Sequence, residues 1–300
     1  MDAPARNAVI VVNHGSHELL ERYLAPLAAT LDAEIVVVDN SPTQQGRDAA
    51  FEVVSGHGWH LVQTTNDGFG SGVNRGVAEA LALGCETLLV LNPDLGLDAA
   101  TATALLDAAR ADPGAVLSPR IDRTDGRIWF AGGALDLARG RTAPARTGSI
   151  AWLSGACFAM ASSTWTDVGG FDDAFFLYWE DVDLSVRVTA SGRTLVLRDD
   201  LVAVHEVGGT QEHSGTRRKS DVYYRHNCRS RLVFAARHLD GRARRRWLLG
   251  APGFAWEVLL RGGRRQLLRS PRPALAAARG TAEGAWFLLL HARRHAGTSA

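Results

Sequence analysis

Asp94 is the side chain whose position in the sequence most clearly suits ligand binding. It closes the tripeptide Asn92-Pro93-Asp94, which follows the apolar, strand-like run 87–91. A carboxylate at the carboxyl end of a strand lies where open α/β sheets bind their ligands. Asp94 is therefore placed where a divalent cation and a diphosphate could meet. The alternative is a turn that merely ends the strand, because Asn-Pro is a common turn signal that needs no ligand.

A second carboxylate, Asp39, ends a run of valine and isoleucine and is followed by Asn40 and Ser41. Its oxygens can accept a hydrogen bond from the imide N–H of a uracil or thymine ring. Asp, Asn and Ser also favour turns and helix caps. This short pattern alone therefore leaves both interpretations open.

The stretch NDGFGSGVNRG at 66–76 is typical of a glycine-rich junction between a strand and a helix. Glycines let a ligand approach the backbone, and a helix N-terminus favours anions. A Rossmann dinucleotide site is the rival interpretation. Its third glycine would fall at position 73, whereas this chain has Gly72, and the next strand ends in Asn92 rather than in an acidic residue. The spacing therefore disfavours a dinucleotide site.

Glu180 and Asp181 open an expected helix directly after the aromatic run 175–179. Aromatic rings exclude water and so raise the basicity of a carboxylate. Carboxylates at a helix start are also common for electrostatic reasons, but the nearby Asp183 favours a chemical role. His205 ends a later strand. A lone histidine is commonly structural, yet imidazole with carboxylate and diphosphate oxygens suits Mg²⁺ or Mn²⁺.

Hydrophobic patterning indicates the elements that must position these side chains. Up to Pro113 the expected strands and helices alternate strictly, which predicts a parallel sheet covered by helices and built from right-handed crossovers. The expected strands are 8–13, 34–39, 60–64 and 87–92, and the expected helices are 18–31, 47–54, 71–83 and 98–110.

Past Pro113 the rhythm changes. We expect a mobile loop at 139–149 and an apolar segment of small residues at 151–161. The further expected strands are 115–118, 127–135, 194–197 and 201–205, the last two around an Asp-Asp turn, and the further expected helices are 181–191 and 220–238. We expect one continuous domain over 1–240 and a basic helical extension over 241–300.

The composition is that of an ordinary globular protein with a strongly uneven charge. The chain of 300 residues is 46% hydrophobic and 22% charged, which is typical of soluble proteins with a buried core. Residues 241–300 contain twelve arginines, no lysine and two glutamates, so a local charge of +10 offsets −9 in the first 240 residues. This split predicts an acidic enzyme body and a basic tail that meets anions.

Cysteine usage and the termini indicate a cytoplasmic protein. Cys85, Cys157 and Cys228 are widely spaced, without metal-clip or redox-motif spacing, and are expected to be reduced and buried. The polar residues 1–7 lead directly into a strand, which is unlike a signal peptide. No apolar run reaches the roughly eighteen residues of a membrane span.

Seven short motifs together indicate a family. In order they are VVVDNS at 36–41, NxGFGxGxNxG at 66–76, LNPD at 91–94, SGAC at 154–157, GGFD at 169–172, WEDxDLxxR at 179–187 and HxxG at 205–208. Over roughly 8–235 the chain thus resembles the family 2 glycosyltransferases, most closely their bacterial rhamnosyltransferase-like branch. The resemblance implies a GT-A fold, which is a Rossmann-like, mostly parallel α/β sheet flanked by helices. It also implies a nucleotide-sugar donor, Mg²⁺ or Mn²⁺, and inversion at the anomeric carbon.

Four residues match the family's functional positions. Asp39 matches its nucleobase-binding carboxylate and Asp94 the metal-binding Asp of its Asp-x-Asp motif. Asp181 matches the catalytic base, and His205 the late metal or diphosphate ligand. The chain departs from the motif at Asn92, which replaces the first Asp and removes one negative charge, as is usual in the rhamnosyl-like branch.

The full set of expected contacts is larger. We expect the donor to contact Asn13, Asp39, Asn66, Gly68, Asn74, Asn92 and Asp94, and the acceptor to contact Gly155, Ala156, Trp179 and Glu180. The expected donor is dTDP-rhamnose, with UDP sugars second. The expected acceptor is a hydroxyl of a lipid-linked or cell-wall glycan, in cell-wall or polysaccharide biosynthesis. The alternative is a catalytically silent protein that binds nucleotide sugars or polyanions.

The tail mixes arginines with Trp247, Trp256 and Trp286. Interfacial helices have this composition, although helices packed on the body with solvated arginines have it as well. Aromatic residues fit a membrane better than nucleic acid, and no nucleic-acid recognition motif is present. We therefore expect an anionic membrane surface as partner and a peripheral position on the inner face of the cell membrane. The sequence does not indicate the oligomeric state.

Overall fold

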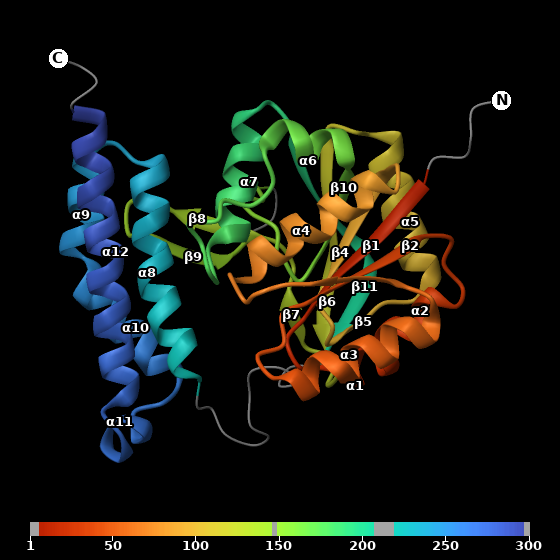
Figure 1. Ribbon diagram of the computed structural model, residues 1–300. Coiled ribbons are helices and arrows are strands. Elements are labelled where there is room, and N and C mark those ends of the chain that lie inside the picture. The colour runs from red at the N-terminus through yellow and green to blue at the C-terminus, as the bar shows by residue number, and fades with distance from the viewer. Residues whose placement is uncertain (1–5, 146–148, 207–218, 297–300) are drawn as a thin grey trace. The chain divides into compact units, whose positions relative to one another are not determined.

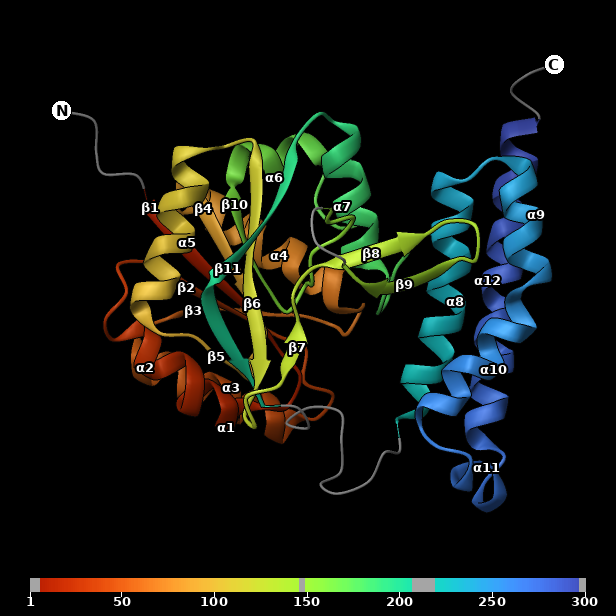
Figure 2. The ribbon, with the colours of Figure 1, turned by 180° about the vertical axis from the view of Figure 1, so that it is seen from behind.

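The structure, a computed structural model, describes residues 6–145, 149–206 and 219–296 (Figures 1 and 2). The chain divides into two compact units. The first comprises Met1–Ala134, Ala143–Asp173 and Asp181–Thr210, and the second comprises Leu135–Thr142, Ala174–Glu180 and Gln211–Ala300. The expected division at residue 240 stays a prediction. Gly208, the last residue of the final motif, lies outside the described residues.

A nine-stranded sheet forms the centre of the first unit, with the order β3-β2-β1-β4-β10-β6-β11-β5 and β7 paired to β6. Within it, β1 to β4 are parallel neighbours, and β6 and β11 are also parallel to each other. The mostly parallel α/β sheet predicted from the sequence is therefore confirmed. The strands are β1 (Arg6–Asn13), β2 (Glu34–Asp39), β3 (His60–Gln63), β4 (Cys85–Leu91), β5 (Leu95–Gly96), β6 (Ala115–Arg123), β7 (Ile128–Phe130), β10 (Cys157–Ala161) and β11 (Thr194–His205).

Alternating side chains of the sheet enter two separate cores. Val9 and Val11 of β1 pack with α5 and with the helical segment after β1, whereas Ile10 and Val12 pack with α4, α6 and α7 on the other face. This burial on both faces explains why the strands read as continuous apolar runs. The helices are α1 (His17–Leu19), α2 (Ala25–Ala28), α3 (Gln44–His57), α4 (Phe69–Ala82), α5 (Ala99–Ala111), α6 (Ser162–Val168) and α7 (Glu180–Ala190), with the π-helical turn η1 (Leu20–Leu24) between α1 and α2.

Two expectations for the region after Pro113 are wrong, those for the loop at 139–149 and for the two strands at 194–205. The expected loop at 139–149 contains the strand β9 (Arg141–Pro144), which pairs with β8 (Gly133–Asp136) in a separate two-stranded sheet. The expected pair of strands at 194–205 is the single strand β11, whose pairing with β6 shifts register between Arg198 and Val202. The small-residue segment ends in β10, which is antiparallel to both β4 and β6.

The second unit is mainly helical. It contains α8 (Asp221–His238), α9 (Gly241–Leu249), α10 (Ala251–Arg261), α11 (Arg265–Arg269) and α12 (Arg272–Ala296). Gly280 and Gly284 let α12 approach α8 closely, since a Cβ on Gly280 would lie 1.9 Å from the carbonyl oxygen of Arg225. Within the described residues, no helix is long and apolar enough to cross a membrane.

Trp247, which the sequence suggested as a membrane contact, is instead a core residue of this unit. Its side chain is only 1% exposed, and its indole N–H donates to the carbonyl oxygen of Leu137. The guanidinium of Arg231 lies 4.7 Å from the indole centroid, and Phe234 stacks on the same side chain. A membrane role for Trp247 is therefore excluded by its burial.

Candidate active site

The carboxyl end of β2 presents a buried carboxylate with an open hydrogen-bonding position. Asp39 pairs in register with Asn13 of β1, and the amide Nδ2 of Asn13 donates to its Oδ1 at 2.8 Å. The hydroxyl of Ser41 donates to the same oxygen at 2.6 Å. The other oxygen, Oδ2, is buried without a hydrogen-bond partner among the described residues. Because an unsatisfied buried acceptor is costly, a ligand N–H is its natural partner.

Thr64 is a neighbour of this position that sequence patterns did not single out. It follows β3, and its backbone N–H donates to the carbonyl oxygen of Asp39 at 2.9 Å. Its hydroxyl is also buried without a partner in the described part of the chain. Asn66 lies two residues further and accepts hydrogen bonds from the Asn40 side chain and from the backbone N–H of Gly68.

The glycine-rich junction mainly brings α4 close to the sheet. Gly68 precedes α4 with a φ of 108°, a conformation that strongly favours glycine. A Cβ on Gly76 would lie 2.5 Å from Ile10, so this glycine permits close packing on β1. Asn74 bonds to both the backbone N–H and the carbonyl oxygen of Phe171. These bonds hold Asn74 in the scaffold, and its expected contact with the donor stays a prediction.

Asp94, which follows β4, and His205, which ends β11, lie close together. His205 is the last residue of β11 and pairs with Leu95, while the backbone N–H of Glu206 donates to the carbonyl oxygen of Asp94. This pairing brings Nε2 of His205 within 3.4 Å of Oδ1 of Asp94, and both side chains are buried. Burial lowers the pKa of His205, although Asp94 opposes this shift and Arg123 adds to it. A neutral imidazole with an available lone pair results at neutral pH.

The Asp94–His205 pair fits two of the ligands of one divalent cation. Neighbouring ligands of an octahedral ion, at bond lengths of about 2.1 Å, lie about 3 Å apart, close to the observed separation. Within the described residues there is no cluster of three or more His, Cys, Asp or Glu side chains suited to a metal. A cation held here would therefore take its remaining ligands from diphosphate oxygens and water, as Mg²⁺ commonly does.

Asp181 stands in the first turn of α7, close to the segment that follows Leu153. Its Oδ2 accepts from the backbone N–H of Gly155 at 3.2 Å, and its Oδ1 accepts from the backbone N–H of Val182 at 2.8 Å. Burial nevertheless raises the pKa of Asp181 to about 6, against the opposing effect of these two N–H groups. The carboxylate is therefore ionised at neutral pH and more basic than an exposed Asp.

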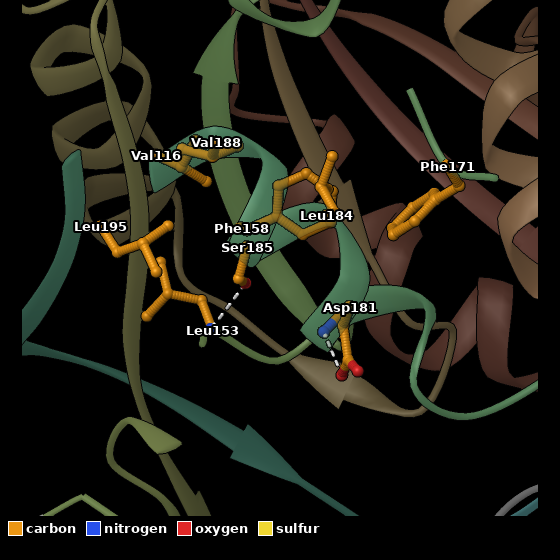
Figure 3. Close-up of a pocket in the computed structure, with 10 residues that line it drawn as sticks. Val116, Leu153, Phe158, Phe171, Asp181, Leu184, Ser185, Val188 and Leu195 are labelled. Atoms are coloured by element: carbon orange, nitrogen blue, oxygen red, sulfur yellow. Dashed lines mark hydrogen bonds between the residues drawn. The ribbon is translucent and has the colours of Figure 1, made fainter. Parts of the chain in front are cut away.

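The cause of this shift is visible in the surroundings of Asp181. It lines a small pocket in which Ser185 is the one other polar side chain among apolar ones, including Leu153, Phe158 and Leu184 (Figure 3). The hydroxyl of Ser185 already accepts a hydrogen bond from the backbone N–H of Leu153. The pocket therefore offers Asp181 little solvation.

The segment 154–157 connects the two carboxylate positions. The backbone N–H of Asn92 donates to the carbonyl oxygen of Ala156 at 2.9 Å, and Gly155 next to it donates to Asp181. The structure thus brings four expected site residues together: Asn92, Gly155, Ala156 and Asp181. Whether Gly155 and Ala156 contact an acceptor stays a prediction.

The two residues before Glu180 have unusual backbone conformations. Tyr178 and Trp179 have φ angles of 63° and 70°, which are uncommon for residues other than glycine. Such strain persists where packing enforces it and is frequent at functional sites. Trp179 is 5% exposed and packs against Phe234 and Trp247 in the second unit. Glu180 is buried as well, and contacts of both residues with an acceptor stay predictions.

Comparisons with known proteins agree with the motif order. The family model described as "Glycosyl transferase family 2" matches residues 8–182. An N-acetylglucosaminyl-diphospho-decaprenol L-rhamnosyltransferase of Mycobacterium tuberculosis is 28% identical over 277 residues, covering 80% of this chain and 88% of the relative. The low-salt glycan biosynthesis hexosyltransferase Agl10 of Haloferax volcanii is 26% identical over 193 residues, covering 60% of each chain.

Solved structures show the same fold. The crystal structure of Staphylococcus aureus TarS, residues 1–349, superposes with a TM-score of 0.51 at 16% identity, covering 97% of this chain and 92% of that one. GalNAc-T7 with UDP, GalNAc and Mn²⁺ superposes with a TM-score of 0.56 at 16% identity, covering 82% of this chain and 54% of that one. The fold of the chain is GT-A.

The raised pKa of Asp181 predicts the pH dependence of transfer. The carboxylate becomes protonated as the pH falls through about 6, so kcat/KM for the acceptor should be level above pH 7 and fall about tenfold by pH 5. Asp181→Asn should lower kcat by about 10²–10⁴-fold while donor affinity stays nearly unchanged. Steady-state rates from pH 5 to 8 and calorimetric donor binding measure both effects. A level profile, or a variant above a tenth of the wild-type rate, would remove Asp181 from the base role.

Proposed function

The chain belongs to glycosyl transferase family 2 as a rhamnosyltransferase-like hexosyltransferase, and we propose that it moves rhamnose from dTDP-rhamnose to a hydroxyl of a lipid-linked glycan, with inversion. The observation that carries this proposal is the environment of Asp181. Its carboxylate is held by two backbone N–H groups beside an apolar pocket. A catalytically silent binding protein would have no need of such a base.

The proposed reaction is a single displacement. The acceptor oxygen attacks the anomeric carbon as Asp181 takes the hydroxyl proton, and the bond from that carbon to the diphosphate breaks with its electron pair leaving on the diphosphate. Attack from the side opposite the leaving group inverts the configuration. The hydroxyl acidifies as the new bond forms, so a carboxylate with a pKa of about 6 serves well in the transition state.

Asp94 and His205 are the proposed holders of Mg²⁺ or Mn²⁺. When bound, the cation supplies positive charge that stabilises the departing diphosphate. Asp94 contributes a charged ligand and His205 a neutral one, which suits Mn²⁺ somewhat better than Mg²⁺. Because Asn92 takes the place of a first carboxylate, the site has one negative charge fewer than an Asp-x-Asp motif provides.

Asp39 supports a pyrimidine donor. Its buried Oδ2 has no hydrogen-bond partner in the described chain and can accept from the N3–H that uracil and thymine both present. Guanine also carries an imide-like N–H, so Asp39 alone does not separate GDP from the other nucleotides. The preference for rhamnose and for a polyprenyl-diphosphate acceptor rests on the named activity of the mycobacterial relative. A role in cell-wall polysaccharide synthesis follows from that acceptor.

A polyprenyl acceptor stays in the membrane, and we propose that the second unit brings the enzyme to it as a peripheral protein on the cytoplasmic face. The face of α12 opposite the glycines that contact α8 exposes Leu275, Trp286, Leu289 and Leu290. Trp286 is 64% exposed, and Trp256 of α10 is 53% exposed. Exposed aromatic and leucine side chains on an amphipathic helix are typical of interfacial helices.

Exposed arginines favour an anionic surface as partner. Glu257 and Glu283, the two glutamates after residue 240, are already paired with arginines. The exposed arginines after residue 240 without an ion pair in the described chain are Arg242, Arg245, Arg246, Arg261, Arg264, Arg265, Arg269 and Arg272. Each basic residue near an anionic leaflet contributes roughly 1 kcal/mol, which salt screens.

The cation site can be tested through nucleotide affinity. Asp94→Ala should lose the gain in dTDP affinity that Mn²⁺ provides, and His205→Ala should lose less of it, because a carboxylate supplies charge and imidazole only a lone pair. Calorimetry with dTDP in Mn²⁺ and in EDTA measures both. Equal Mn²⁺-dependent affinity for wild type and Asp94→Ala would refute the assignment.

The donor proposal can be tested by thermal stability with nucleotides. A ligand at 100 times its Kd stabilises a protein by about 2.7 kcal/mol, so dTDP and UDP with Mn²⁺ should raise the melting temperature more than GDP does. Asp39→Asn should remove this rise. Its amide oxygen can still accept from Asn13 and Ser41, but its NH₂ would then face the N3–H of the base. Stabilisation by GDP alone would overturn the choice of donor, and release of dTDP from dTDP-rhamnose with an acceptor tests transfer itself.

The membrane proposal can be tested by sedimentation with vesicles. The full-length protein should sediment with phosphatidylglycerol vesicles at low salt and be released at high salt, and Trp286→Gln should weaken binding severalfold. Phe51→Gln is the matched control, because Phe51 is an exposed aromatic residue of the first unit. Deleting the tail is unsuitable, since Trp247 is part of the core around α8. A wild-type protein that stays in the supernatant would exclude the membrane role.

A further inference from the structure

Within the described residues, the imidazole of His205 lacks the hydrogen bond that usually orients a metal-binding histidine. Such histidines commonly donate their second ring N–H to a carboxylate or a carbonyl group, which fixes the ring. Here Nε2 faces Asp94, and Nδ1 is buried without a hydrogen-bond partner among the described residues. Another interaction must therefore set the plane of the ring.

Trp129 provides a stacking surface for that ring. The centroids of Trp129 and His205 are 4.6 Å apart, and their planes differ by only 3°. Trp129 is itself partly buried and packs against the core beneath the sheet. Because this packing holds the indole in place, the stack restricts tilting of the imidazole. It does not restrict rotation of the imidazole within its own plane.

The local strand geometry accounts for the position of the indole. β7 pairs antiparallel with β6 through Ile121 with Phe130 and through Asp122 with Ile128. Trp129 is the extra residue between these two pairs, as in a β-bulge. Bulges redirect a side chain and are frequent next to active sites.

The backbone of His205 is fixed independently of Trp129. His205 pairs with Leu95, and the side chain of the next residue, Glu206, accepts hydrogen bonds from Tyr23 at 2.6 Å and from Arg22 at 3.1 Å. Tyr23 and Arg22 belong to the π-helical turn η1. Since these contacts hold the main chain, the stack on Trp129 sets only the orientation of the His205 ring.

We propose that Trp129 is a positioning residue that holds the imidazole of His205 in the plane required to bind the cation–diphosphate group of the donor. The inference rests on the proposed role of His205 and extends it to a residue that acts through the imidazole of His205. The stack takes the place of the missing hydrogen bond at Nδ1. An aromatic ring at position 129 is thus required for the function of His205, whereas an aliphatic side chain of similar bulk is insufficient.

The test compares two substitutions of one side chain with a control on the same strand. Trp129→Leu removes the flat surface and Trp129→Phe keeps one. Phe130→Leu removes an aromatic ring that contacts Trp152 and the edge of Trp129 but makes no ring contact with His205. Calorimetric dTDP affinity is measured in Mn²⁺ and in EDTA, with circular dichroism and melting temperature as checks on folding. We expect Trp129→Leu to lose about tenfold or more of the affinity in Mn²⁺, and Trp129→Phe and Phe130→Leu to retain most of it.

The outcomes separate this inference from the function on which it rests. A loss for Trp129→Leu that is confined to Mn²⁺ supports positioning for the cation, and an equal loss in EDTA supports positioning for the diphosphate itself. Wild-type affinity in a folded Trp129→Leu, or an equal loss in Phe130→Leu, would overturn the inference alone. If His205→Ala binds dTDP as wild type does under both conditions, the proposed role of His205 fails and the inference fails with it.

Discussion

The register of the central sheet is the constraint on which the site depends. The strands β1, β2 and β4 are buried on both faces, so a slip of one residue would exchange the two cores and misplace every side chain at the strand ends. The same register sets Asn13 beside Asp39, and the short pairing of β11 with β5 sets His205 beside Asp94. Hydrophobic packing thus positions the polar groups at the strand ends.

Local patterns in the sequence were sufficient for the first half of this sheet. The parallel strands up to β4 are short apolar runs that end in a polar residue or, for β4, directly before Asn92, so their approximate bounds and their functional edge could be predicted together. The later strands depend on long-range pairing, which the local sequence pattern does not indicate. β10 lies antiparallel between β4 and β6 only because the chain returns after residue 150, and β11 remains one strand because pairing with β6 resumes after the Asp-Asp turn.

The roles of individual side chains were harder to predict than the positions of strand ends, because the same residue type can either contact a ligand or hold the fold together. Gly76 and Asn74 belong to a glycine-rich motif, yet their contacts hold α4 against the sheet and against Phe171. Trp247 stands among arginines, as interfacial residues often do. The acceptor of its indole N–H is the carbonyl oxygen of Leu137, which lies 110 residues away in the chain and could not be predicted from the local sequence. Conversely, Thr64 and Trp129 gave no signal, since their significance arises from an unpartnered hydroxyl and a bulge.

The site separates its two electrostatic tasks. The proposed base needs a carboxylate with a raised pKa, which the apolar pocket around Asp181 provides, while two N–H bonds keep that carboxylate ionised at neutral pH. The proposed leaving-group site needs concentrated positive charge and is placed around Asp94 and His205. If a cation lay beside Asp181, it would lower the pKa of the base and weaken it. Hydrogen bonds tie Asp181 to the backbone of Gly155, and tie the backbone of Asn92, two residues before Asp94, to the adjacent Ala156. The spacing of the two groups can therefore stay fixed while each keeps its own electrostatic environment.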